Sequence, residues 1–98
     1  MSTESNTLSQ SLFSLGQVVA TPALIKHFEQ HRIDFWHYLA RHVSGDFGDL
    51  DDTDKAANRQ AIQLGGRVFS AYDIAGLRIW IITEADRSST TVLFPSEY

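Results

Sequence analysis

Four histidines are the residues of this chain whose side chains best suit acid–base or metal chemistry. His27 and His31 are four residues apart, so a continuous helix places them on one face, where two imidazoles can hold a metal ion. No carboxylate stands at a matching step to act as a third ligand, so we expect surface histidines and no metal site. His37 and His42 follow, and His42, just before a Gly/Asp-rich loop, is our candidate acid or base.

The acidic loop over residues 46–54 is the second candidate site. Several oxygens from a flexible loop suit Ca²⁺, but this loop lacks the sixth-position Gly and the closing Glu of an EF-hand. Carboxylates at the start of a helix also accept hydrogen bonds from free backbone N–H groups and complement the helix dipole. We expect this capping role, and cation binding stays open. The aspartates are Asp46, Asp49, Asp51, Asp52 and Asp54.

Arg78, Glu84 and Arg87 form a third polar group, on and just after an expected β-strand. Together with His42, such side chains at the rim of a sheet can bind a phosphate or cleave RNA by acid–base catalysis. Residues of these types also shape turns or pair with one another at the surface, and we favour this second interpretation. We therefore predict no catalytic residue, and keep the four as the site of an alternative ribonuclease.

The composition limits the classes of function. Twelve acidic and eight basic residues give a net charge of −4, and the basic residues are scattered singly, which disfavours nucleic-acid binding. Without cysteine, disulfides and thiol nucleophiles are excluded. No apolar stretch is long enough to span a membrane, and the N-terminus lacks the features of a secretory signal. We expect a cytoplasmic protein without a cofactor.

Capping signals predict three helices. Serine and threonine dominate residues 1–14, which we expect to be a flexible arm, whereas residues 15–98 form a single domain. The helix starts are expected at Thr21-Pro22, at Asp34 and at Asp51 or Asp52, and the second and third helices are expected to end at Gly45 and at Gly65-Gly66.

Three consecutive β-strands are predicted in the last third of the chain, from the segments RVFSAYDI, LRIWIITE and STTVLF. Short connections make them an antiparallel meander. A further short strand is expected over residues 15–20. The fold class is therefore α+β, with a short N-terminal strand, three helices and a three-stranded antiparallel β-meander.

The middle strand of this meander is apolar on both faces, so both faces of the sheet need cover. The three helices are expected to cover one face. The N-terminal segment or a second copy of the chain would cover the other, where Phe69, Trp80 and Phe94 otherwise stay exposed. We therefore expect a homodimer, with Trp80, Ile82 and Phe69 as candidate binding residues.

The segments LGQVVATPALI, LARHVSGDFGDLDDTDKAANRQAI and RIWIITEADRSSTTVLFPSEY resemble a family of small uncharacterised proteins carried on bacterial plasmids, integrative elements or gene cassettes. The resemblance covers residues 15–98. It implies a mobile-DNA setting in bacteria, and it implies no activity and no functional residue.

The order of helices before a meander is also similar in fold to ribonuclease toxins of the RelE and barnase type, although this chain is acidic. We expect a non-enzymatic protein-interaction module of a mobile element. The alternatives are a RelE/barnase-like ribonuclease toxin and a small-ligand or metal-binding protein.

Overall fold

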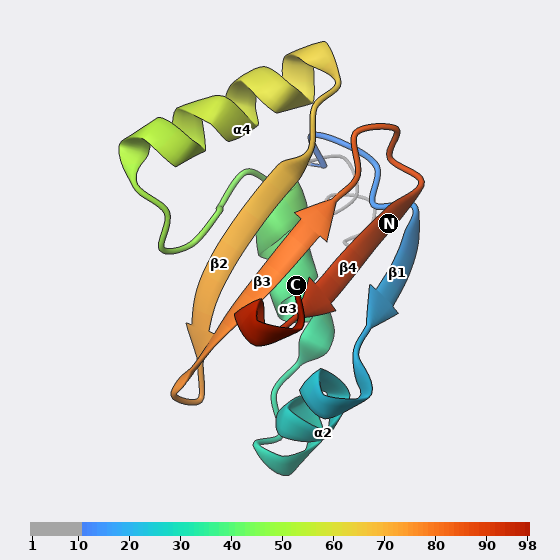
Figure 1. Ribbon diagram of the computed structural model, residues 1–98, viewed down its shortest axis with the longest axis vertical. Coiled ribbons are helices and arrows are strands. Elements are labelled where there is room, and N and C mark those ends of the chain that lie inside the picture. The colour runs from blue at the N-terminus through green and yellow to red at the C-terminus, as the bar shows by residue number, and fades with distance from the viewer. Residues whose placement is uncertain (1–10) are drawn as a thin grey trace, which may run out of the picture.

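The computed structural model describes residues 11–98, in which three α-helices and a four-stranded sheet are followed by a short 3₁₀ helix (Figure 1). Residues 1–10, most of the predicted arm, lie outside the described residues. In chain order the elements are β1 (Gln17–Ala20), α2 (Pro22–Gln30), α3 (Phe35–Val43), α4 (Asp52–Leu64), β2 (Val68–Ile74), β3 (Leu77–Thr83), β4 (Ser89–Leu93) and η1 (Pro95–Glu97).

The sheet has the strand order β1-β4-β3-β2 and is mixed. β2, β3 and β4 form the predicted antiparallel meander, but the sheet does not end there, because β1 pairs with β4 in parallel, with Val18 opposite Thr90. The expected three-stranded sheet is therefore incomplete. A parallel pair needs a long crossover, and here all the intervening helices and strands form it, so no short-range signal indicates the pairing.

Capping chemistry sets the helix boundaries as predicted. The side chains of Thr21, Asp34 and Asp51 accept hydrogen bonds from backbone N–H groups in the first turns of α2, α3 and α4. α4 ends at Gly65, whose φ of 88° lies in the left-handed region that favours glycine. These three caps confirm the helix starts read from the sequence.

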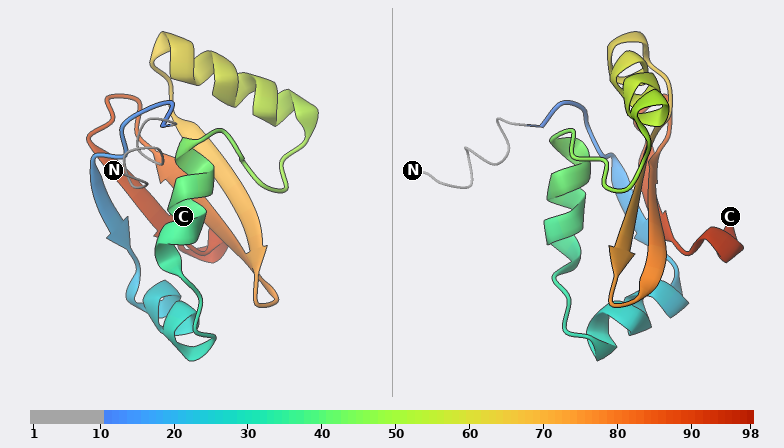
Figure 2. Two further views of the ribbon diagram at one scale, coloured as in Figure 1. Left: turned by 180° about the vertical axis from the view of Figure 1, so that it is seen from behind. Right: turned by 90° about the vertical axis from the view of Figure 1, so that its left-hand side faces the viewer.

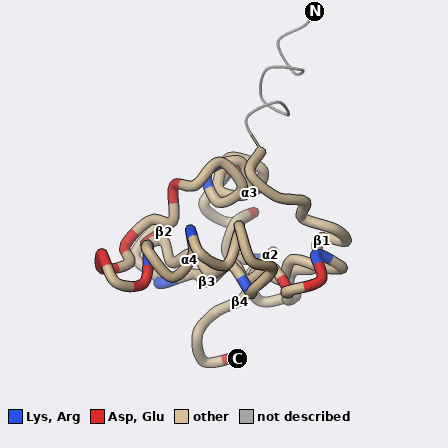
Figure 3. Tube along the Cα trace, turned by 90° about the horizontal axis from the view of Figure 1, so that it is seen from above, with Lys and Arg blue, Asp and Glu red and all other residues tan. Residues whose placement is uncertain are grey.

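The hydrophobic core lies on one face of the sheet, beneath α3, and α2 closes it at one end with Leu24 and Phe28 (Figure 2). α4 does not share in this cover, which corrects the expectation that all three helices pack on one face. Its side chains are mostly polar, with Asn58 alone buried, and it packs against the edge strand β2. Figure 3 shows β1 and β2 at opposite ends of the sheet, with α3 on one face and the C-terminus on the other. The buried core residues are Leu24, Phe28, Leu39, Tyr72, Ile74, Ile79, Ile81 and Val92.

Candidate functional site

His42, the candidate acid or base, is fully buried between α3 and the sheet. Its Nδ1 lies 2.5 Å from Ser70 Oγ and its Nε2 lies 2.9 Å from Thr83 Oγ1. Thr83 Oγ1 in turn lies 2.7 Å from Thr90 Oγ1, which donates to the carbonyl oxygen of Leu15. His42 thus belongs to a chain of hydrogen bonds that joins α3, three strands and the segment before β1.

The donors in this network of hydrogen bonds fix the tautomer of His42. Because Thr90 uses its hydroxyl proton on Leu15, Thr83 must donate to Thr90 and accept from the Nε2–H of His42. Nδ1 is then the acceptor for the Ser70 hydroxyl. Burial lowers the pKa of His42 to about 3. These hydrogen bonds hold His42 as a neutral imidazole without contact with solvent. They are structural contacts between α3 and the sheet.

The other three residues of the ribonuclease alternative do not join His42. Arg78 pairs with Asp73 at 3.2 Å, and Glu84 lies 3.5 Å from Arg67. Both belong to the face of β3 opposite the one that carries Thr83, the partner of His42. The guanidinium of Arg87 donates to backbone carbonyls in the α4–β2 region and in its own turn. The four side chains therefore form separate structural contacts.

His27 and His31 do share a face of α2, with ring centroids 4.6 Å apart. His27 Nε2 lies 3.0 Å from the carbonyl oxygen of Ile74, so one of its ring nitrogens is engaged in the fold. Within residues 11–98, no three histidine or acidic side chains come together in a way that could hold a metal ion.

One aspartate of the acidic loop has the expected capping role, and two others pair with arginines. Asp51 caps α4, accepting from the backbone N–H of Asp54 at 2.8 Å. Asp46 accepts from Arg41 Nε at 2.7 Å, and this hydrogen bond lowers the pKa of the Asp46 carboxyl. Asp49 lies 3.8 Å from Arg78. These three carboxylates thus cap a helix or pair with an arginine.

The predicted interface around Trp80 is partly covered by the chain's own C-terminus. The ring of Tyr98 lies 5.7 Å from that of Trp80, and its hydroxyl accepts from Arg67 at 2.9 Å. Trp80 is half-buried, Ile82 is buried, and a hollow of about 210 Å³ remains beside them and Phe69. Part of the cover on this face thus comes from the segment after β4, which was not expected, and cover by a second copy stays a prediction.

The outer edge of β2 is closed by other parts of the chain. Asn58 of α4 donates to the carbonyl oxygen of Phe69 at 2.6 Å and accepts from its N–H at 3.0 Å. Further along, Ala71 donates to Phe47 at 3.1 Å and accepts from the N–H of Asp49 at 2.7 Å. A side-chain amide and a loop therefore replace a neighbouring strand.

As far as the structure describes the chain, the outer edge of β1 is open. Gln17 donates its backbone N–H to Ser88, just before β4, and Thr21 donates to Val92 of β4, so alternation turns the N–H groups of Val18 and Ala20 away from the sheet. Among residues 11–98, β4 is the only strand paired with β1, and the two outward residues have no backbone partner. The strand QVVA also lacks the charges and prolines that usually protect an edge.

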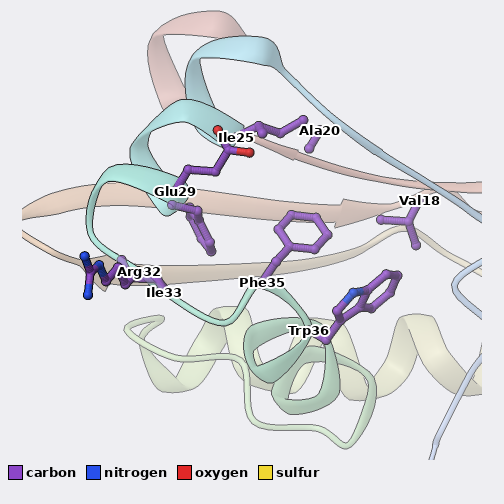
Figure 4. Close-up of a pocket in the computed structure, with 9 residues that line it drawn as sticks. Val18, Ala20, Ile25, Glu29, Arg32, Ile33, Phe35 and Trp36 are labelled. Atoms are coloured by element: carbon purple, nitrogen blue, oxygen red, sulfur yellow. The ribbon is translucent and has the colours of Figure 1, made fainter.

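An apolar hollow of about 450 Å³ lies beside this edge, between β1, α2 and the start of α3 (Figure 4). Phe35 and Trp36 rise from α3 toward Val18, and Glu29 and Arg32 stand at the opposite end. A second hollow of about 590 Å³, lined by Phe13, Leu15, Leu39 and Val43, among others, also touches Trp36.

Trp36 stands where the two hollows meet and is 62% exposed. The sequence indicated only that it is one of several apolar residues on the second helix. Trp36 lies three residues before Leu39, which faces the core, so helical spacing puts both on the same side of α3 and gives no signal that sets Trp36 apart. The open edge of β1, the first hollow and Trp36 are together called the β1 surface.

No helix within residues 11–98 combines the length and the apolar character that crossing a membrane requires. We compared the chain with protein-family models, with curated proteins and with solved structures, and none of the three comparisons gave a match.

Proposed function

We propose that this chain is a non-enzymatic protein-interaction module that binds an extended polypeptide strand along the open edge of β1. The observation that carries the proposal is the contrast between the two edges of one sheet. At β2, the side chain of Asn58 and the loop through Asp49 occupy the outward backbone groups. At β1, the outward groups of Val18 and Ala20 have no backbone partner in the part of the chain that the structure describes.

An open edge strand is a template for a further strand, because its unpaired N–H and C=O groups are spaced for a β-ladder. In such complexes the main chain supplies affinity, and hollows for alternate side chains supply specificity. The hollow beneath Val18 and Ala20 is apolar, with Glu29 and Arg32 at one end. It suits a strand that presents an apolar side chain toward the helices.

Exposed apolar side chains support this location. Ile25 and Trp36 are exposed although they are large and apolar, and both line the hollow beside β1. Val19 is also exposed, but it lies on the opposite face of the strand from Val18 and Ala20. Exposed apolar side chains around one hollow are typical of a protein-binding surface. The predicted site around Trp80 offers a partner less apolar surface, because Tyr98 already packs on the Trp80 ring.

A ribonuclease is not favoured, because His42 is sealed from solvent and the other three residues make separate contacts. The setting on a bacterial mobile element remains part of the proposal on the strength of the sequence resemblance.

Selection from a displayed library of random peptides tests the proposal. We expect peptides with apolar residues at alternate positions to bind the immobilised chain. Their binding should be lost in Val18→Pro, which removes an outward N–H, and weakened in Trp36→Ala. Leu64→Ala is the matched control, because Leu64 is also exposed but lies on α4. The proposal fails if no selected peptide depends on Val18 and Trp36.

A further inference from the structure

We infer that the strand bound by the β1 surface is β1 of a second copy of this chain. The two copies are related by a twofold axis, and their sheets continue into each other. This inference rests on the proposed function, and it names the partner.

The backbone of β1 satisfies the geometry of such a pair. With the axis at Val19, antiparallel pairing sets Val18 of one copy opposite Ala20 of the other. Residues in a hydrogen-bonded antiparallel pair exchange both of their N–H···O bonds. Each outward N–H and C=O of Val18 and Ala20 then meets a partner, and the strand has no other outward residue between them. Pairing with a copy of itself therefore satisfies the outward backbone groups of both residues of this short strand.

The side chains of β1 fit the same register. Val19 meets Val19 of the second copy at a non-hydrogen-bonded position, where facing side chains lie closest and β-branched pairs stabilise a sheet. On the helix side, Val18 lies opposite the Ala20 of the second copy, so apolar residues meet there as well. Val19, which is apolar and exposed, thus becomes part of a sheet face that continues from one copy into the other.

Trp36 gives the reason for a second copy rather than an unrelated strand. It lies beside Val18, and the hollow extends from there to Ala20 and Ile25 (Figure 4). Because the pairing sets Val18 of one copy against Ala20 of the other, each Trp36 is carried toward Ala20 and Ile25 of the other copy's hollow. An unrelated strand can satisfy the backbone, whereas a second copy also brings its own exposed Trp36 to the hollow in the same contact.

Sedimentation equilibrium over a concentration series, from about 1 µM to about 1 mM, tests the inference. We expect a monomer–dimer equilibrium for the unaltered chain. Val18→Pro removes one hydrogen bond from each copy and should raise the dimer dissociation constant by about 30-fold or more. Trp36→Ala should raise it as well. Val18→Ala keeps the N–H and should have a smaller effect than Val18→Pro.

Controls separate loss of pairing from loss of folding. Leu64→Ala should leave the dissociation constant unchanged, since Leu64 is 75% exposed and lies on α4. The N–H of Val18 points out of the sheet, so Val18→Pro should keep the far-UV circular dichroism of the unaltered chain. Trp36→Ala is the second test if Val18→Pro does not fold.

Each outcome decides between the inference and the function on which it rests. A chain that stays monomeric throughout, yet binds selected peptides that depend on Val18, overturns the second copy and leaves the interaction module standing. A dimer that is insensitive to both Val18→Pro and Trp36→Ala places self-association elsewhere and also overturns the inference. A monomer that binds no such peptide overturns both proposals.

Discussion

Acid should destabilise this domain through His42, well above the pH at which carboxylates are protonated. In the unfolded chain a histidine binds its proton near pH 6.5, whereas burial lowers the pKa of His42 in the folded chain to about 3. Between these values the unfolded state binds more protons, so stability falls as the pH falls. The contribution is fully present above the unfolded pKa and is lost toward the folded one.

The size of the effect follows from the two pKa values. Going from about pH 7 to about pH 5 should lower the free energy of unfolding by about 2 kcal/mol, because each pKa unit is worth about 1.4 kcal/mol. Nδ1 is where the added proton must go, and the Ser70 hydroxyl that donates to it would have to turn away. The total free energy of unfolding of a small domain is only about 5–15 kcal/mol, so this loss is measurable.

Urea unfolding at low protein concentration, followed by tryptophan fluorescence across this pH range, measures the effect. His42→Gln removes the titrating group, so its free energy of unfolding should be lower at neutral pH but nearly independent of pH. His37→Gln is the matched control on the same helix, where His37 is exposed, and it should keep the slope of the unaltered chain. Asp46, whose pKa is lowered, titrates below this range.

An equal pH dependence in the unaltered chain and in His42→Gln would refute the reasoning. It would mean that the folded chain takes up the proton as readily as the unfolded chain, and therefore that His42 is not held neutral between α3 and the sheet.

Three substitutions test the contacts that close the rest of the fold. Arg87→Ala should lower the free energy of unfolding by about 2 kcal/mol, because the partly buried carbonyl oxygens of Ala61 and Gly66 each lose a charged donor. An unchanged urea midpoint would contradict this. Asn58→Ala should cost about 2 kcal/mol in the same assay, and Asn58→Asp no less, because a carboxylate oxygen would face the carbonyl of Phe69. Gly48→Ala should cost about 3 kcal/mol or more, since a Cβ there would lie 2.1 Å from a β2 carbonyl oxygen. Gly76 has a similar φ, but a Cβ there would meet only open space, so Gly76→Ala should cost about 1 kcal/mol. Equal melting temperatures for Gly48→Ala and Gly76→Ala would exclude the clash at Gly48.

The elements were predictable because their signals are local. Thr21, Asp34 and Asp51 cap their helices through side-chain oxygens that reach N–H groups two or three residues away. The meander follows from alternation over neighbouring segments. The candidate site was not predictable in this way. His42 was singled out by its residue type and its place before a loop, and neither property reveals burial.

The site residues that the sequence missed are defined by what surrounds them. Nothing in QVVA indicates that this strand lies at an edge, and nothing near Trp36 indicates that its neighbours form two hollows. The contact of Tyr98 with Trp80 was not predicted for the same reason, since only the three-dimensional path of the last residues brings Tyr98 to it.

The sequence by itself determined the helices, the three strands of the meander and the roles of the capping aspartates. Hydrogen bonds between near neighbours and side-chain periodicity specify these features. Tertiary structure alone decided that β1 lies beside β4, that Asn58 closes one edge, and that the other edge stays open beside Trp36 among the described residues. Those contacts join residues far apart in the chain, and they depend on which packing buries the core best. The proposed binding surface belongs to this second group.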